Sequence, residues 1–257
     1  DLDSSLVGSE MCIRDRDIDA VLAGPFFQGS RLVSLRGRLL FAESQVFGRK
    51  AALKMKVLSA HCNRKPRVFL NTELREALAY LKDRVLNAPP RVINSQPRNV
   101  YHLYTDACHE ESGGGLGAIM YDTKGVMYRW FSAWLSPEDL SRINPEGKQT
   151  LIFELEAMAA IWGALNLGKT WKHCDAIIFC DNEAVLSCLI RGRSDSSVVN
   201  RLLESLLRWE TENDVTLWFE RVPSKSNPAD LPSRDPECKL AGLQCHLPLK
   251  ELLSELC

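Results

Sequence analysis

Residues 101–108, with the sequence YHLYTDAC, constrain the fold more than any other stretch of this chain. The pattern is typical of a short buried strand that ends in one carboxylate, Asp106, and a glycine-rich turn over residues 112–117 follows it. Removing an unpaired carboxylate from water costs several kcal/mol unless a cation or a hydrogen-bond donor compensates for the lost hydration. The sequence therefore predicts a partner for Asp106 at the end of this strand.

The composition is ordinary for a water-soluble chain, with 45% hydrophobic and 25% charged residues among 257. No run approaches the ~20 apolar residues of a membrane span, and the first residues lack the basic-then-apolar pattern of a signal peptide. We therefore expect an intracellular protein of the cytoplasm or nucleus, with no membrane partner. The nine cysteines show neither a C-x-x-C pair nor zinc-site spacing, which favours reduced thiols.

The net charge of -1 hides an uneven distribution along the chain. Residues 17–100 carry 15 Lys and Arg against 6 Asp and Glu, whereas residues 101–235 carry 13 against 20. This split suggests a part that binds a polyanion, joined to a part whose acids are concentrated for another purpose, such as holding cations. Two solvated surfaces of opposite sign are the alternative.

Four segments are expected along the chain. Residues 1–16 lack periodicity, resemble translated adaptor sequence and are interpreted as a tail that is not native. Residues 17–96 alternate apolar clusters with basic side chains, which indicates packed helices, the last beginning at Asn71 or Thr72, before a proline-containing linker over 87–99. A domain over residues 97–235 and a C-terminal tail over residues 236–257 follow.

The domain over residues 97–235 is expected to be α/β, with a mixed five-stranded sheet flanked by helices. Three short strands should form an antiparallel meander, and a helix that is apolar almost all round should pack deeply against the sheet. A strand, a helix, another helix and a last strand follow. The expected strands are 100–105, 115–121, 125–132, 176–180 and 215–222, and the expected helices are 151–167, 182–190 and 198–210.

Four acids occupy comparable positions in this domain. Asp106 and Asp181 each end a strand, Glu154 lies in the first turn of the apolar helix, and Asp230 stands where a short helix should begin. If the two strands are neighbours, these carboxylates meet at one edge of the sheet and repel one another. Hard divalent cations relieve that repulsion, because Mg²⁺ prefers oxygen ligands and binds alongside substrate phosphates. A pair of such ions about 4 Å apart is the usual clamp for displacement at a phosphodiester, although each acid alone would by default be a solvated surface group.

Four motifs, YTDAC, FELEAMAAIWGAL, IIFCDNEAV and VPSKSNPADLPSR, resemble in order and spacing the ribonuclease H domain of retroelement reverse transcriptases. The last is similar to long-terminal-repeat and DIRS-like retrotransposons. The resemblance covers residues 98–235 and implies that Asp106, Glu154, Asp181 and Asp230 are catalytic ligands of two Mg²⁺ ions, with Mn²⁺ as a substitute. It also implies an RNA:DNA hybrid as substrate and the remainder of a reverse transcriptase polyprotein as partner. Residues 31–96 are more weakly similar to the preceding thumb and connection.

Candidate substrate contacts lie close to these motifs. Gln149 and Thr150 precede the apolar helix and are candidates for a ribose 2′-hydroxyl contact, Asn182 is a substrate contact or a helix cap, and Lys225 is a candidate for phosphate. Glu156 is expected to be a poor ligand, because it faces about 160° away from Glu154 around the helix.

Departures from the family pattern leave alternatives open. No Y-x-D-D polymerase motif is present, and residues 224–226 stand where many ribonucleases H have a loop histidine. The expected function is a metal-dependent endoribonuclease that cuts the RNA strand of a hybrid. The alternative is a catalytically degenerate nucleic-acid-binding or structural module of a retroelement polyprotein. A transposase or proofreading exonuclease fits less well, because a D-x-E start is missing and the final ligand is Asp.

Overall fold

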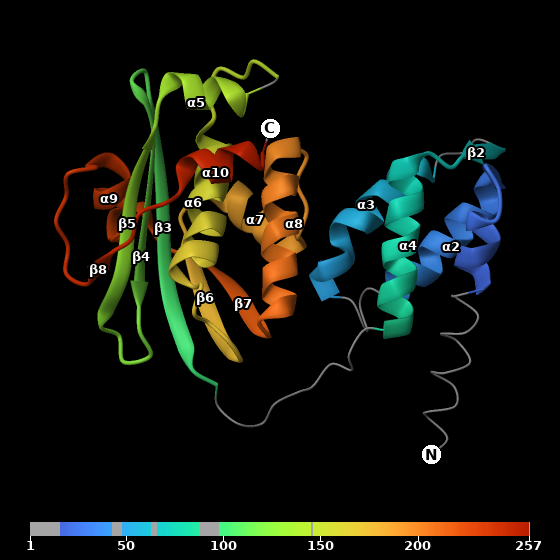
Figure 1. The fold of residues 1–257 in the computed structure, drawn as a ribbon, viewed down its shortest axis with the longest axis horizontal. Helices are drawn as coiled ribbons and strands as arrows, with labels where there is room; N and C mark the ends of the chain where they lie inside the picture. The colour runs from blue at the N-terminus through green and yellow to red at the C-terminus, as the bar shows by residue number, and fades with distance from the viewer. Residues whose placement is uncertain (1–15, 43–47, 63–65, 88–97, 145, 257) are drawn as a thin grey trace. The chain divides into compact units, whose positions relative to one another are not determined.

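The computed structural model describes residues 16–42, 48–62, 66–87, 98–144 and 146–256 (Figure 1). The chain divides into two units, residues 1–95 and residues 96–257, and each buries its own set of apolar side chains. Most of the expected N-terminal tail and of the expected linker lies outside the described residues.

The first unit is mainly helical. Leu35, Met55 and Leu78 belong to its buried core, and Asn71 caps the last helix by accepting a 2.9 Å hydrogen bond from the amide of Leu74. That cap confirms Asn71 as the start signal predicted from the sequence. The elements are β1 (Phe26–Gln28), α2 (Gly29–Ala42), the 3-10 turn η2 (Gly48–Ala51), α3 (Ala52–His61), β2 (Arg67–Phe69) and α4 (Thr72–Asn87), with β1 and β2 paired antiparallel.

The second unit is built on a mixed sheet with the strand order β7-β6-β3-β4-β5-β8. The first three strands along the chain form an antiparallel meander, and β6 lies parallel to both β3 and β7. The expected mixed α/β fold is thus observed, with one strand more than expected. The strands are β3 (Val100–Glu110), β4 (Gly113–Tyr121), β5 (Met127–Leu135), β6 (Cys174–Cys180), β7 (Val215–Arg221) and β8 (Leu243–Gln244).

Helices cover both faces of this sheet. Figure 1 shows α6, α7 and α8 on one face and the short α9 on the opposite face. Helix α6 is buried almost all round, as its apolar sequence predicts. The helices are α5 (Pro137–Arg142), α6 (Ile152–Leu167), α7 (Glu183–Arg191), α8 (Ser197–Glu212), α9 (Asp230–Arg234) and α10 (Leu249–Ser254), with the 3-10 turn η3 (Ser224–Ser226) before α9.

The glycine run after Asp106 is strand rather than the predicted turn. Strand β3 continues to Glu110, and Gly114 to Gly117 lie within β4 opposite it. Glycine is needed there because α9 lies against this strand: a Cβ at Gly115 would overlap the carbonyl group of Ser233, and one at Gly117 would overlap the Ser233 amide. The glycines therefore let α9 approach the sheet closely.

The segment expected to be a C-terminal tail belongs to the second unit. Its strand β8 pairs with the outer edge of β5, and Cys238 packs against Ile119 and Trp130. This pairing satisfies part of an edge that would otherwise present unpaired backbone groups. Among the residues that the model describes, no helix is long and apolar enough to cross a membrane, and the seven described cysteines are free thiols.

Candidate active site

Asp106 is buried on the face of β3 that α9 covers. Its side chain is 3% exposed, and it accepts a 2.5 Å hydrogen bond from the Ser233 hydroxyl and a 3.3 Å bond from the Asn227 amide. Burial raises the pKa of Asp106 to about 6; the Ser233 hydrogen bond lowers it, and the charges of Asp181 and Asp230 raise it further. Asp106 therefore has hydrogen-bond donors and lies among other acids, and the charge of the partly exposed Arg234 only partly offsets theirs.

The parallel pairing of β3 with β6 stops just before Asp106. The last pair joins Tyr104 to Phe179, after which β6 ends at Cys180 and Asp181 begins the following bend. The side of β3 that faces β6 is therefore open at the level of Asp106. This is the shared sheet edge that the sequence predicts for Asp106 and Asp181.

Glu156, on α6, lies at the point where the pairing of β3 and β6 stops. Its carboxylate, the Cys180 thiol and the Asp181 carboxylate offer ligand atoms that all lie within 4.8 Å of one another. The Ala107 amide donates a hydrogen bond to Glu156, but burial and the charges of Asp106 and Asp181 outweigh it and raise the pKa of Glu156 to about 9. Without a cation, Glu156 is held in its protonated form at neutral pH.

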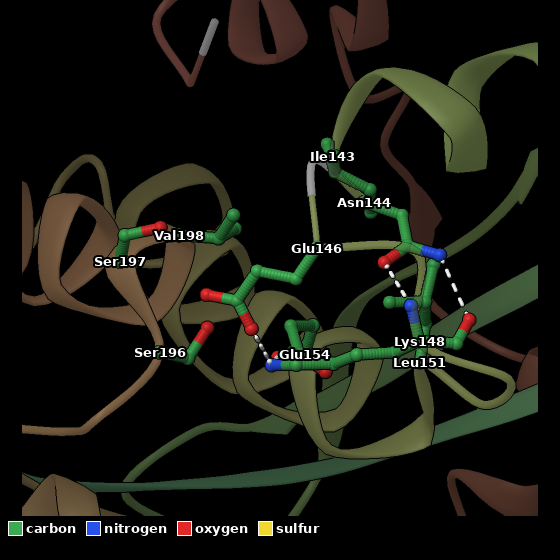
Figure 2. Close-up of a pocket in the computed structure, with 9 residues that line it drawn as sticks. All are labelled: Ile143, Asn144, Glu146, Lys148, Leu151, Glu154, Ser196, Ser197 and Val198. Atoms are coloured by element: carbon green, nitrogen blue, oxygen red, sulfur yellow. Dashed lines mark hydrogen bonds and ion pairs between the residues drawn. The ribbon is translucent and has the colours of Figure 1, made fainter.

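Glu154 lies elsewhere, which corrects the expectation from the sequence. Its buried carboxylate forms a 2.7 Å ion pair with Lys148 and lines a pocket with Asn144 and the start of α8 (Figure 2). The two glutamates do point to opposite sides of α6, as the helical period requires, but Glu156 is the one that joins the carboxylates. Glu156 therefore takes the place that the sequence interpretation gave to Glu154.

A signal for this register is present in the sequence. Seven residues separate Glu156 from Gly163, almost two helical turns, so the two lie on one side of α6, whereas Glu154 and Gly163 lie on opposite sides. Gly163 faces the sheet, where a Cβ would meet Ala118 and Leu103. Gly163 therefore marks the side of α6 that faces the sheet, and Glu156 lies on that side. This signal would have identified Glu156, and not Glu154, as the candidate metal ligand.

Asp230 begins α9, as predicted, and lies close enough to Asp106 for its charge to raise the pKa of that carboxyl. Its side chain is about half exposed and pairs with Arg234 at 2.7 Å. The charges of Asp230 and Arg234 act on the pKa of Asp106 in opposite directions. Three of the four predicted acids, Asp106, Asp181 and Asp230, are thus brought together.

The candidate substrate contacts other than Asn182 lie at exposed positions. Gln149, Thr150 and Lys225 are exposed, and Thr150 Oγ1 lies 3.5 Å from the ring Nδ1 of His109 on β3. The side chain of Asn182 caps α7 by accepting hydrogen bonds from the amides of residues 184 and 185. The cap interpretation of Asn182 is therefore confirmed, and a contact with substrate stays a prediction.

Sequence reasoning missed the two side chains that hold Asp106. Asn227 donates to the Thr105 carbonyl at 3.0 Å as well as to Asp106, and Ser233 also bonds the Asp230 carbonyl. Both belong to the motif VPSKSNPADLPSR. The available signal was that these two polar residues flank Asp230 in the motif. A buried carboxylate such as Asp106 requires hydrogen-bond donors, and residues near another acid of the site are candidates for that role.

The donor set suits a hard divalent cation. The carboxylates of Glu156, Asp181 and Asp106 offer oxygen atoms. Burial and the repulsion among these acids raise the pKa values of Asp106 and Glu156. A bound cation would reverse this repulsion and favour the ionised forms. Cys180 adds a softer donor, but burial and the neighbouring acids raise the pKa of its thiol strongly, so its proton is retained.

The fold resembles several solved structures. A ribonuclease H1 isolated from compost by a metagenomic approach matches with 17% identity and a TM-score of 0.41, over 52% of this chain and 92% of the other. Ribonuclease H1 of Halobacterium salinarum matches with 13% identity and a TM-score of 0.35, over 51% and 90%. A foamy viral protease-reverse transcriptase in complex with RNA/DNA hybrid matches with 12% identity and a TM-score of 0.38, over 64% and 26%.

No family model matches the sequence, and no curated protein matches it either. The solved structures have low identities and low TM-scores, so they describe a similar arrangement of chain and carry no information on activity.

Proposed function

We propose that this chain is a divalent-metal-dependent endoribonuclease that hydrolyses the RNA strand of an RNA:DNA hybrid. The observation that carries the proposal is the convergence of Glu156, Cys180 and Asp181 within 4.8 Å beside buried Asp106. A group of buried acids that raise one another's pKa values, at the point where the pairing of two neighbouring strands stops, has a chemical use as a cation site. As a structural element it would only destabilise the fold.

The proposed ligands are Asp106, Glu156, Asp181 and Asp230. Two Mg²⁺ ions bound there would activate a water molecule and stabilise the leaving oxygen of a phosphodiester, with Mn²⁺ as a substitute. Ser233 and Asn227 hold Asp106 through its two oxygen atoms, and the Ala107 amide orients Glu156. These bonds fix the carboxylates before substrate arrives, as a preorganised site requires.

The proposed substrate is supported by exposed polar side chains of the same unit. Gln149 and Thr150 are available for a ribose 2′-hydroxyl, and Lys225 for a phosphate. Contacts of this kind distinguish RNA from DNA without reading base sequence. The reverse-transcriptase context is proposed from the motifs and from the basic first unit, which would contact nucleic acid phosphates.

Cleavage of an end-labelled RNA:DNA hybrid with Mg²⁺ tests the proposal, using the matched pair Glu156→Gln and Glu154→Gln. Removing one ligand of a metal site should lower kcat by a factor of about 100 or more. We expect that loss in Glu156→Gln and in Asp106→Asn, whereas Glu154→Gln should retain most of the wild-type kcat because Glu154 lies outside the cluster.

Two results would contradict the proposal. Wild-type protein that cuts no hybrid under these conditions would favour the alternative of a nucleic-acid-binding module without activity. Equal loss of kcat in Glu154→Gln and Glu156→Gln would show that the carboxylate cluster is not the reacting centre. Duplex DNA and free RNA serve as control substrates, and neither should be cut at a comparable rate.

A further inference from the structure

Glu154 is a buried carboxylate that the proposed reaction does not use. Its side chain is 3% exposed, and its described partner is the ammonium group of Lys148 at 2.7 Å. Burial of a carboxylate is costly, and the pair persists only where its geometry is good. Lys148 also lies 3.2 Å from the exposed carboxylate of Glu146. The ion pair therefore joins the first turn of α6 to the segment that precedes it.

The backbone of Lys148 is fixed as well as its side chain. Asn144 Oδ1 accepts a 2.8 Å hydrogen bond from the Lys148 amide, and Asn144 Nδ2 donates a 2.9 Å bond to the Lys148 carbonyl (Figure 2). Lys148 is thus held by two bonds at its peptide groups and by a buried acid at the far end of its side chain. A segment with this many bonds has few conformations open to it.

The next two residues are the candidate substrate contacts. Gln149 and Thr150 follow Lys148 directly and are exposed. Thr150 lies 3.5 Å from His109, which is three residues along β3 from Asp106. The fixed segment therefore presents Thr150 beside the strand that carries the first carboxylate of the site, and exposed Gln149 precedes Thr150 directly in the chain.

We propose that Glu154, acting through Lys148, is a positioning residue that holds Gln149 and Thr150 in the orientation in which they contact the RNA strand. This inference rests on the proposed function. It gives the two glutamates of FELEAM separate tasks, Glu156 at the reacting centre and Glu154 in substrate binding. Loss of Glu154 should therefore raise KM for the hybrid, and loss of Glu156 should lower kcat.

The test compares Glu154→Gln, Lys148→Met and Lys148→Arg with Glu146→Gln as the matched control. The first two should raise KM about tenfold, the effect of weakening one or two neutral hydrogen bonds from Gln149 and Thr150 to the RNA, with kcat changed by no more than about twofold. Lys148→Arg keeps the charge and should retain a KM close to that of wild type. Glu146→Gln should also behave as wild type, because Glu146 is an exposed partner at the longer distance.

Hydrogen exchange of the free protein supplies a readout that does not depend on activity. The amides of residues 148–150 should exchange faster in Glu154→Gln and Lys148→Met than in wild type and in Glu146→Gln. If Lys148→Met does not fold because it leaves the buried carboxylate of Glu154 without its cation, Glu154→Gln carries the same expectations, since it removes that charge and keeps the shape of the side chain.

The outcomes separate this inference from the proposed function. Wild-type protein that cuts hybrid, combined with an unchanged KM in both Glu154→Gln and Lys148→Met, would overturn the positioning role and leave the proposed function intact. A wild-type exchange rate in these variants would overturn it too, even if KM rose. Wild-type protein without hybrid cleavage would refute the proposed function, and the positioning role with it.

Discussion

Proton linkage at Glu156 gives a prediction that needs no substrate. Its pKa is raised from 4.5 to about 9 by burial and by the charges of Asp106 and Asp181. Between pH 4.5 and about 9, the folded state therefore keeps a proton on Glu156 that the unfolded state has already released. Because the folded form binds more protons in this window, the free energy of unfolding of the metal-free protein should fall as pH rises through it.

The size of the effect follows from the width of the window. One pH unit is worth about 1.4 kcal/mol for a single group that is protonated only in the folded state. Between pH 5.5 and 7.5, Glu156 should lower the free energy of unfolding by about 3 kcal/mol. Glu156→Gln removes the titrating group while keeping its shape and an acceptor for the Ala107 amide, so the variant should not show this loss.

Urea unfolding in EDTA at the two pH values measures the difference. All six tryptophans lie between residues 130 and 218, so their fluorescence reports the second unit alone. The wild-type free energy should fall by about 3 kcal/mol more than that of Glu156→Gln, and Glu154→Gln should follow wild type. Parallel pH dependences for wild type and Glu156→Gln would refute the reasoning, because no excess proton would then be bound at Glu156.

Three further predictions concern the supports of the site. Gly117→Ala should lower both kcat and the melting temperature, because its Cβ would displace α9. Gly163→Ala is the control and should be tolerated, because its Cβ would make only ordinary contacts; equal melting temperatures for the two variants would contradict the close approach of α9. Ser233→Ala removes a hydrogen bond that lowers the pKa of Asp106, so the acid limb of the pH–rate profile should move to higher pH; an unmoved limb would exclude Asp106 from that limb. Asn182→Ala should cost about 1 kcal/mol of stability through loss of the α7 cap, measured by thermal unfolding, and no change would show that the cap is dispensable.

The fold could be anticipated because local signals agree with one another. Short β-favouring runs separated by turn residues predicted the strands, and the apolar run LIFELEAMAAIWGALNL predicted the buried helix. The glycine run was misread as a turn because its glycines serve a contact with α9, more than a hundred residues further on. Pairing of β8 with the edge of β5 depends on the same kind of distant contact, which composition does not reveal.

Part of the site could be predicted from the ends of elements. Asp181 follows the end of β6 and Asp230 begins α9, whereas Asp106 lies within β3, which continues to Glu110 instead of ending at residue 105 as expected. Choosing between Glu154 and Glu156 requires knowledge of which side of α6 faces the sheet, and both residues are buried. Burial alone thus did not distinguish a proposed metal ligand from the partner of a lysine, and the position of Gly163 was the cue.

The bond between Ser233 and Asp106 spans 127 residues of chain, and this sets an order of events during synthesis. Strands β3 to β7 and α6 precede α9 in the chain and can form first, but Asp106 receives the hydrogen bond from Ser233 only after α9 has been made. Contacts of such separation are slow to form, since the chain between them must first be closed. A nascent or C-terminally shortened chain that lacks α9 would therefore carry strands β3 to β7 without a completed carboxylate site, and the proposed activity would require the chain beyond residue 233.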